Sequence, residues 1–165
     1  MTSQPSIRPI FLLGFLMCAG MIGVALFAQY YMLLDPCPLC IFARVATMVI
    51  GAVFLLGAIH NPSGTTGRRV YGQLLVLAAL GGIAITGRHS YLQHLPPEHV
   101  PACGPGLSYW IDNLPAFDVF SKVFQGSGEC AAVSWSMFGL SIPEWTLAVF
   151  AVFMIYGLKV LIKGR

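Results

Sequence analysis

The chain has 165 residues, of which 57% are hydrophobic and 9% charged, with a formal net charge of +3 at pH 7. An ordinary soluble domain carries about 25% charged residues. The composition therefore excludes a typical soluble protein and indicates one whose solvent is a lipid bilayer. The few cations are scattered along the chain, so nothing supports binding to nucleic acid.

Four apolar segments are long enough to cross a bilayer as helices, which takes about 20 residues each. Their ranges are 10–34, 41–59, 71–87 and 145–162. The first continues beyond the roughly 7–15 apolar residues of a secretory signal peptide and has no clear cleavage site, so we interpret it as a retained span. Gln29 is its only strongly polar residue. The sequence predicts an all-α membrane protein, a bundle of four transmembrane helices that forms a single domain over residues 1–165.

The positions of the lysines and arginines predict the orientation of the spans. If the spans alternate in direction, one group of cations lies on one side of the membrane and all six acids lie on the other. The positive-inside rule places the cations, both termini and the turn at 60–69 in the cytoplasm. Loops 35–40 and 88–144 then face outward. The cations are Arg8, Arg68, Arg69, Lys159, Lys163 and Arg165, and the acids are Asp35, Glu98, Asp112, Asp118, Glu129 and Glu144.

Four of the five cysteines fall in the two outer loops. They are Cys37 and Cys40 in the first loop and Cys103 and Cys130 in the second. The outer side is the compartment in which disulfides persist. Cys18 lies alone within the first span, where a free cysteine typically packs as a small apolar residue.

The spacing of Cys37 and Cys40 is typical of a redox dithiol or of half a zinc site. Because this pair lies at the start of the second span, the helix dipole and unpaired N–H groups favour a thiolate at Cys40. A zinc site would take two more ligands, from Cys103 with Cys130 or from loop histidines. Cys103 and Cys130 are too far apart in sequence for ordinary ligand spacing, which favours the redox interpretation.

Arg44 lies one helical turn after Cys40 and on the same face of the predicted helix. A cation so near a helix N-terminus opposes the helix dipole and is costly at a membrane edge. Two interpretations stay open. The side chain extends to a lipid phosphate, or it serves an anion beside Cys40, either the thiolate or a reduced cofactor oxygen.

Cys103 and Cys130 allow two interpretations. A disulfide between them would be a structural cross-link worth about 3–4 kcal/mol. The glycines and prolines around both residues instead indicate a poorly packed, labile bond of the catalytic kind. Between the two cysteines, the periodicity of residues 117–124 predicts a short amphipathic helix, which lies in the outer membrane interface or packs on the end of the bundle.

Several segments together resemble the bacterial disulfide bond formation protein B (DsbB) family. They are LLDPCPLCIFAR at 33–44, RHSYLQ at 88–93, GECA at 128–131 and WSMFGLSIPEW at 135–145. The resemblance implies a multi-pass protein of the bacterial inner membrane with cytoplasmic termini, periplasmic cysteine loops and a short interfacial helix in the second loop. It also implies a quinone-dependent thiol oxidase that reoxidises a DsbA-like periplasmic dithiol oxidase, with ubiquinone or menaquinone as the electron acceptor.

The resemblance assigns a role to each loop cysteine. Cys103 is attacked by the partner's low-pKa cysteine, which frees Cys130. Cys130 then passes the reducing equivalents to the Cys37–Cys40 disulfide and pairs transiently with Cys37. Cys40 is released as a thiolate and donates to the quinone.

By the same resemblance, Arg44 stabilises the negative charge and His89 hydrogen-bonds the quinone. Two residues depart from the family pattern. Pro38 fills a variable position between the paired cysteines, and Ala43 stands before Arg44 where an acidic residue also occurs.

Two other functions are compatible with these residues. One is a quinone-coupled enzyme of the vitamin K epoxide reductase kind, although in that family the loop pair precedes the redox motif, whereas here Cys37 and Cys40 come first. The other is a non-enzymatic membrane assembly or metal-handling protein with structural or metal-binding cysteines. The residues themselves predict no resident metal.

Overall fold

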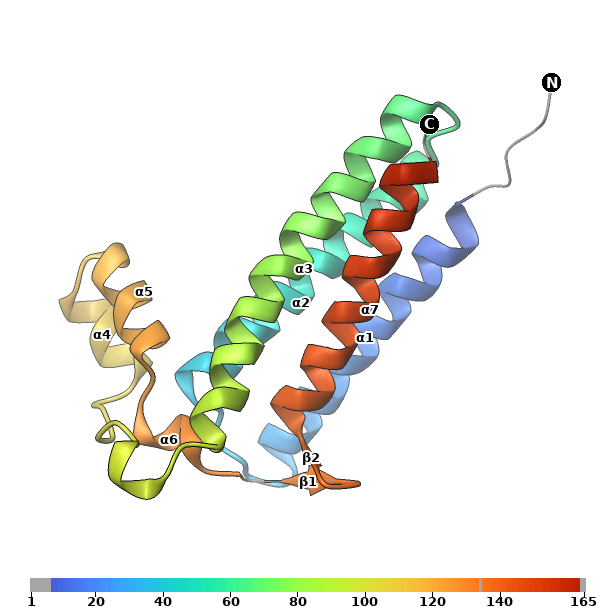
Figure 1. Ribbon diagram of the computed structural model, residues 1–165. Coiled ribbons are helices and arrows are strands. Elements are labelled where there is room, and N and C mark those ends of the chain that lie inside the picture. Colours follow the sequence, from blue (N-terminus) through green and yellow to red (C-terminus); the bar gives the residue numbers. More distant parts are fainter. Residues whose placement is uncertain (1–6, 134, 164–165) are drawn as a thin grey trace.

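Four long helices run side by side in the computed structural model, which describes residues 7–133 and 135–163 (Figure 1). Each of the four is long and apolar enough to cross a membrane. The predicted four-helix membrane bundle is confirmed. Arg165, one of the cations used for the predicted orientation, lies outside the described residues. The helices are α1 (Arg8–Tyr30), α2 (Pro38–His60), α3 (Thr65–Gln93) and α7 (Ile142–Lys163).

Prolines and a left-handed residue set the ends of α1 and α2. Helix α1 ends at Tyr30, short of the predicted 34, and Leu33 takes a φ of 53° as the chain turns. Helix α2 begins at Pro38, earlier than the predicted 41, because proline suits the first helical position. It ends at His60, and the following residue, Asn61, forms a left-handed cap with a φ of 40° and a ψ of 59°.

Helix α3 is longer than the predicted 71–87 at both ends. Hydropathy locates only the apolar centre of a helix, whereas the helix continues through polar residues for as long as no proline interrupts it. The next proline after α3 is Pro96. Consequently Arg88 and His89 lie in the helix, and the second outer loop begins at His94 instead of at 88.

The core lies along the middle of the bundle, where Phe11, Phe54 and Phe150 are almost fully buried. Helices α3 and α7 approach closely because Gly72 faces the α7 backbone. A Cβ at Gly72 would lie 2.9 Å from the Leu161 nitrogen. Small residues allow such contacts between membrane helices. Many other apolar side chains point outward, as expected of helices surrounded by lipid.

The loop between α3 and α7 folds into several short elements (Figure 1). Helices α4 and α5 stand beside one end of the bundle, and α6 lies under it. The elements are η1 (Pro97–His99), α4 (Leu107–Asn113), α5 (Ala116–Gln125), α6 (Gly128–Ala131), and the antiparallel strands β1 (Ser136–Met137) and β2 (Leu140–Ser141). The amphipathic helix predicted at 117–124 corresponds to α5.

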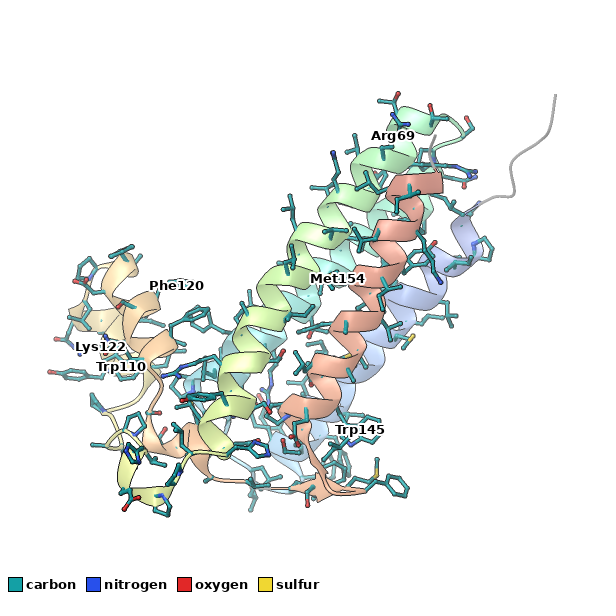
Figure 2. The ribbon with its side chains drawn as sticks, in the orientation of Figure 1. Arg69, Trp110, Phe120, Lys122, Trp145 and Met154 are labelled. Carbon is teal, nitrogen blue, oxygen red and sulfur yellow. The ribbon has the colours of Figure 1, made fainter. Side chains whose placement is uncertain are left out.

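Two sets of contacts join this loop to the bundle. Arg88 of α3 donates hydrogen bonds to the carbonyls of Phe124, at 2.9 Å, and Gln125, at 3.0 Å. Phe120, which is labelled in Figure 2, lies with its ring centroid 6.2 Å from that of Phe42 in α2. These contacts support packing of α5 against the bundle.

The strands form a hairpin at the start of α7, near Trp145 (Figure 2). Phe138 and Gly139 both have positive φ, at 54° and 79°, as a two-residue hairpin turn requires. The Trp145 ring nitrogen donates to the Met137 carbonyl at 3.2 Å. The hairpin is thereby fixed to the N-terminal end of α7.

Replacing Gly72 by Ala should separate α3 from α7, because the added Cβ would lie within 3.0 Å of backbone atoms that cannot rotate away. We expect a loss of about 1–3 kcal/mol in stability, measured as a lower thermal midpoint in detergent. Gly81→Ala is the matched control, since a Cβ at Gly81 meets nothing within 4 Å. Equal midpoints for the two variants would contradict the close approach.

Candidate active site

The paired cysteines lie at the start of α2. Cys37 is the N-cap, and its sulfur accepts a hydrogen bond from the Cys40 backbone N–H at 3.3 Å. Both side chains are free thiols, and their sulfurs are 3.0 Å apart. Proline at the first helical position and cysteine at the cap therefore place two sulfurs side by side at the N-terminal end of α2.

His89 reaches this pair from α3. Its side chain is 4% exposed, and Nε2 lies 3.7 Å from the Cys37 sulfur. It also interacts with the backbone of Cys130. The extra turns of α3 are what bring the imidazole to the sulfurs.

Cys130 comes to the same place from the loop between α3 and α7. Its side chain is 0% exposed and touches Cys37, the backbone of Leu39 and Ser127, whose hydroxyl lies 3.7 Å from the sulfur. Hydrogen bonding from the Cys37 thiol lowers the pKa of Cys130 to about 6, with help from the Leu39 and Ser127 backbone donors. Donation to Cys130 and Cys40, together with burial, raises the pKa of Cys37 above its usual range. Cys130 is therefore a thiolate beside a Cys37 that keeps its proton.

Cys103 differs from these three because it is exposed. It lies against the first residue of α6, where a Cβ on Gly128 would be 3.0 Å from the Cys103 sulfur. The Gly128 N–H donates to the Ala102 carbonyl at 3.4 Å. Because Gly128 has no side chain, Cys103 can lie against α6 at a residue only two positions before Cys130. Cys18, in contrast, is buried against Gly51 within the α1–α2 contact and takes no part in this arrangement.

Arg44 turns toward α1. One terminal nitrogen donates to the Gln29 side-chain oxygen, and the other to the Ala25 carbonyl at 3.1 Å. The guanidinium is partly buried, and its charge interacts with Cys40. The predicted pairing of Arg44 with the Cys40 face of the helix is thus compatible with the geometry.

The chain matches the protein family described as "Disulfide bond formation protein DsbB" over residues 7–160. It belongs to the DsbB family. The disulfide bond formation protein B of Chromohalobacter salexigens is 53% identical over 156 residues, which cover 94% of this chain and 91% of that protein. The protein of the same name from Nitrosococcus oceani is 52% identical over 145 residues, covering 88% and 85%. That from Methylococcus capsulatus is 49% identical over 146 residues, covering 88% of each.

Membership of the DsbB family confirms the resemblance and a function in disulfide bond formation. The chain is accordingly a multi-pass membrane protein with four candidate spans. The roles of individual residues remain predictions, although the structure brings Cys37, Cys40, Cys130 and His89 together.

One group of side chains could hold a metal by distance alone. The ligand atoms of Cys37, Cys40 and His89 all lie within 4.8 Å of one another. A tetrahedral zinc site takes four ligands, and Cys130 would be the obvious fourth. Cys37, Cys40 and Cys130 were all considered as zinc ligands from the sequence, and His89 is one of the histidines of the predicted loop 88–144. Within the described part of the chain this is the one such group.

Two residues contact the candidate site in ways that the sequence does not predict: Ser127 contacts Cys130, and Gln29 contacts Arg44. Ser127 was not identified, although its position three residues before Cys130, at the N-cap of α6, is a typical place for a side-chain oxygen. Gln29 was noticed as a lone polar residue in an apolar span, but its partner could not be assigned. Such a residue signals a partner on a neighbouring helix.

The pKa of the Cys130 thiol should be about 6, well below that of an ordinary cysteine. Between these values Cys130 is a thiolate in the reduced protein. Replacing Cys37 by Ala removes the main donor, so the pKa of Cys130 should rise toward 9. The measurement is a pH titration of the cysteine ¹³Cβ resonance. A midpoint that stays near 6 in the variant would show that Cys37 is not the cause.

Proposed function

We propose that this DsbB-family protein is a quinone-dependent protein-disulfide oxidoreductase. It reoxidises a DsbA-like periplasmic thiol oxidase and passes the electrons through two cysteine pairs to ubiquinone or menaquinone in the membrane. The observation that carries the proposal is the burial of Cys130 against Cys37, because it places a cysteine of the second outer loop beside the dithiol of the first.

The first exchange begins at Cys103. The partner's thiolate attacks the Cys103 sulfur of a Cys103–Cys130 disulfide, which forms a mixed disulfide and releases Cys130 as the leaving thiolate. The partner's second thiol then attacks its own sulfur in the mixed disulfide, so that the partner leaves oxidised and Cys103 is reduced. Exposure of Cys103 gives the partner access, and the low pKa of Cys130 makes it a good leaving group.

The second exchange takes place at the outer end of the bundle. The Cys130 thiolate attacks the Cys37 sulfur of the Cys37–Cys40 disulfide, which forms a Cys130–Cys37 bond and frees Cys40 as a thiolate. Attack by the reduced Cys103 on Cys130 restores the loop disulfide and leaves Cys37 and Cys40 reduced. The contact between Cys37 and Cys130 supports this order.

The residues around Cys40 fit a quinone. Arg44 and Gln29 form a polar end of the α1–α2 contact, and an apolar cavity of about 410 Å³ continues along the same contact one turn deeper, lined by Ile22, Thr47 and Met48 among others. A quinone has a polar ring and an apolar tail, so the ring would suit the polar end and the tail would suit the apolar cavity. A bound quinone supplies an acceptor for two electrons and two protons. Cys40 would present the thiolate, Arg44 would hold negative charge, and His89 is our candidate for a hydrogen bond to a quinone oxygen.

The proposed orientation follows from the charges. Figure 1 places the start of α1, the end of α7 and the α2–α3 turn at one end of the bundle, opposite the hairpin and α6. With the positive-inside rule, we infer an inner-membrane protein with cytoplasmic termini and cysteine loops in the periplasm.

Single Cys→Ser variants of the four loop cysteines should abolish oxidation of a reduced thioredoxin-fold partner, because each is one of four sulfurs in a relay. Cys18→Ser should retain activity, since Cys18 lies apart from the four relay sulfurs, and serine keeps the size of a side chain that only lines the apolar cavity. Partner oxidation in isolated membranes is the measurement. The Cys103→Ser variant separates the proposal from a metal-handling function. Cys103 lies outside the Cys37–Cys40–His89 group, so a metal-handling protein would not depend on it.

Arg44→Met should weaken the quinone step by one to two orders of magnitude, because charge-assisted hydrogen bonds are worth about 1.5–3 kcal/mol. We expect a higher KM for soluble quinone at saturating partner and an unchanged KM for the partner. Arg44→Lys should restore part of the loss, since it keeps the charge without the planar fork of donors. A changed partner KM with normal quinone dependence would remove Arg44 from the quinone site and favour contact with a lipid phosphate.

A further inference from the structure

Gln29 takes part in no exchange step, but it lies with Arg44 at the polar end of the proposed quinone site. It lies one residue before the end of α1, partly buried, and accepts a hydrogen bond from an Arg44 terminal nitrogen. The Ala25 carbonyl, one turn earlier on the same face of α1, accepts from the other terminal nitrogen at 3.1 Å. One face of α1 thus engages both terminal nitrogens of a single guanidinium.

These two acceptors are neutral. Among the described residues no carboxylate forms an ion pair with Arg44, and the position before it is Ala43. An amide and a backbone carbonyl can orient a guanidinium without cancelling its charge, whereas a carboxylate would also neutralise it. The guanidinium has five N–H donors, so donors beyond those used by α1 are left for an anion.

The orientation of Arg44 needs such support. An arginine side chain has many rotamers, and one near a membrane edge is drawn outward to lipid headgroups. In the observed orientation, on the α1 side of α2, its charge interacts with Cys40. Gln29 is the side chain that holds it there.

We propose that Gln29 is a positioning residue for the quinone step. It fixes the Arg44 guanidinium across the α1–α2 contact with a neutral acceptor, so that the full positive charge stays beside the Cys40 thiolate and the quinone oxygen. This role of Gln29 rests on the proposed role of Arg44, because Gln29 acts only by holding the Arg44 guanidinium in place.

A purely structural contact between α1 and α2 is the competing explanation, and two substitutions separate it from ours. Gln29→Leu has similar size and removes the acceptor. Gln29→Glu keeps the acceptor and strengthens the attraction between the helices, but it neutralises Arg44. Tyr30→Phe is the control, because it removes a polar atom from the adjacent, exposed position of α1.

Steady-state oxidation should respond to both substitutions. Gln29→Leu should raise the KM for soluble quinone about tenfold, the scale of one hydrogen bond to a charged group, with the KM for the partner unchanged. Gln29→Glu should also raise it, while the thermal midpoint in detergent is at least that of the wild type. Tyr30→Phe should leave the quinone KM unchanged.

A second readout needs no quinone. In quinone-free protein whose only thiol is Cys40, the pH dependence of alkylation reports how well Arg44 stabilises the thiolate. Both Gln29→Leu and Gln29→Glu should shift the midpoint upward. In an Arg44→Met background neither substitution should shift it further, because Gln29 acts through Arg44.

The outcomes are distinguishable. Wild-type quinone KM and alkylation in Gln29→Glu would mean that Gln29 only joins two helices, which overturns the proposal. Effects that multiply in the Gln29→Leu/Arg44→Met double variant would also overturn it, because Gln29 would then act independently of Arg44. If Gln29→Leu has no effect while Arg44→Met does, the proposal fails and the proposed function stands. If neither changes the quinone KM, the quinone site beside Arg44 fails with it.

Discussion

The structure depends on one contact, in which a cysteine from a loop of the chain is buried against a cysteine at the start of a helix. Cys130 meets Cys37 in a small apolar cluster that also contains Leu39, Leu92 and Trp110. A sulfur placed there is removed from water, so its ionisation is governed by the donors around it. The cluster shifts the pKa values of two chemically identical side chains in opposite directions, which favours a thiolate at Cys130 and a thiol at Cys37.

That contact is maintained from several directions. Arg88 ties the end of α5 to α3 through two carbonyls. Gly126 has a φ of 81° and lies where a Cβ would be 2.3 Å from a Leu92 methyl group, so only glycine fits the close turn into α6. The loop is long, but its last turn before Cys130 is held by specific contacts.

The sequence predicted the parts of the molecule that depend on local properties. Apolar length located the four spans, and the Cys37-to-Cys40 spacing with Pro38 located a dithiol at a helix start. The ends of α3 were not predicted, because hydropathy does not measure how far a helix continues through polar residues. The contacts of Gln29 and Ser127 were missed because they depend on how α1 meets α2 and how α6 packs, and neither can be derived from one chain without its tertiary structure.

The difference in exposure between Cys103 and Cys130 has a consequence for leakage. Small thiols in the surrounding solution can collide with Cys103, but Cys130 is 0% exposed and Cys37 is 7% exposed. Of the two cysteines in the loop between α3 and α7, stray reductants therefore meet only Cys103, where they compete with a partner protein that approaches the same atom. Burial protects the Cys37 and Cys130 sulfurs from direct attack by small thiols in solution, whereas Cys40 is partly exposed.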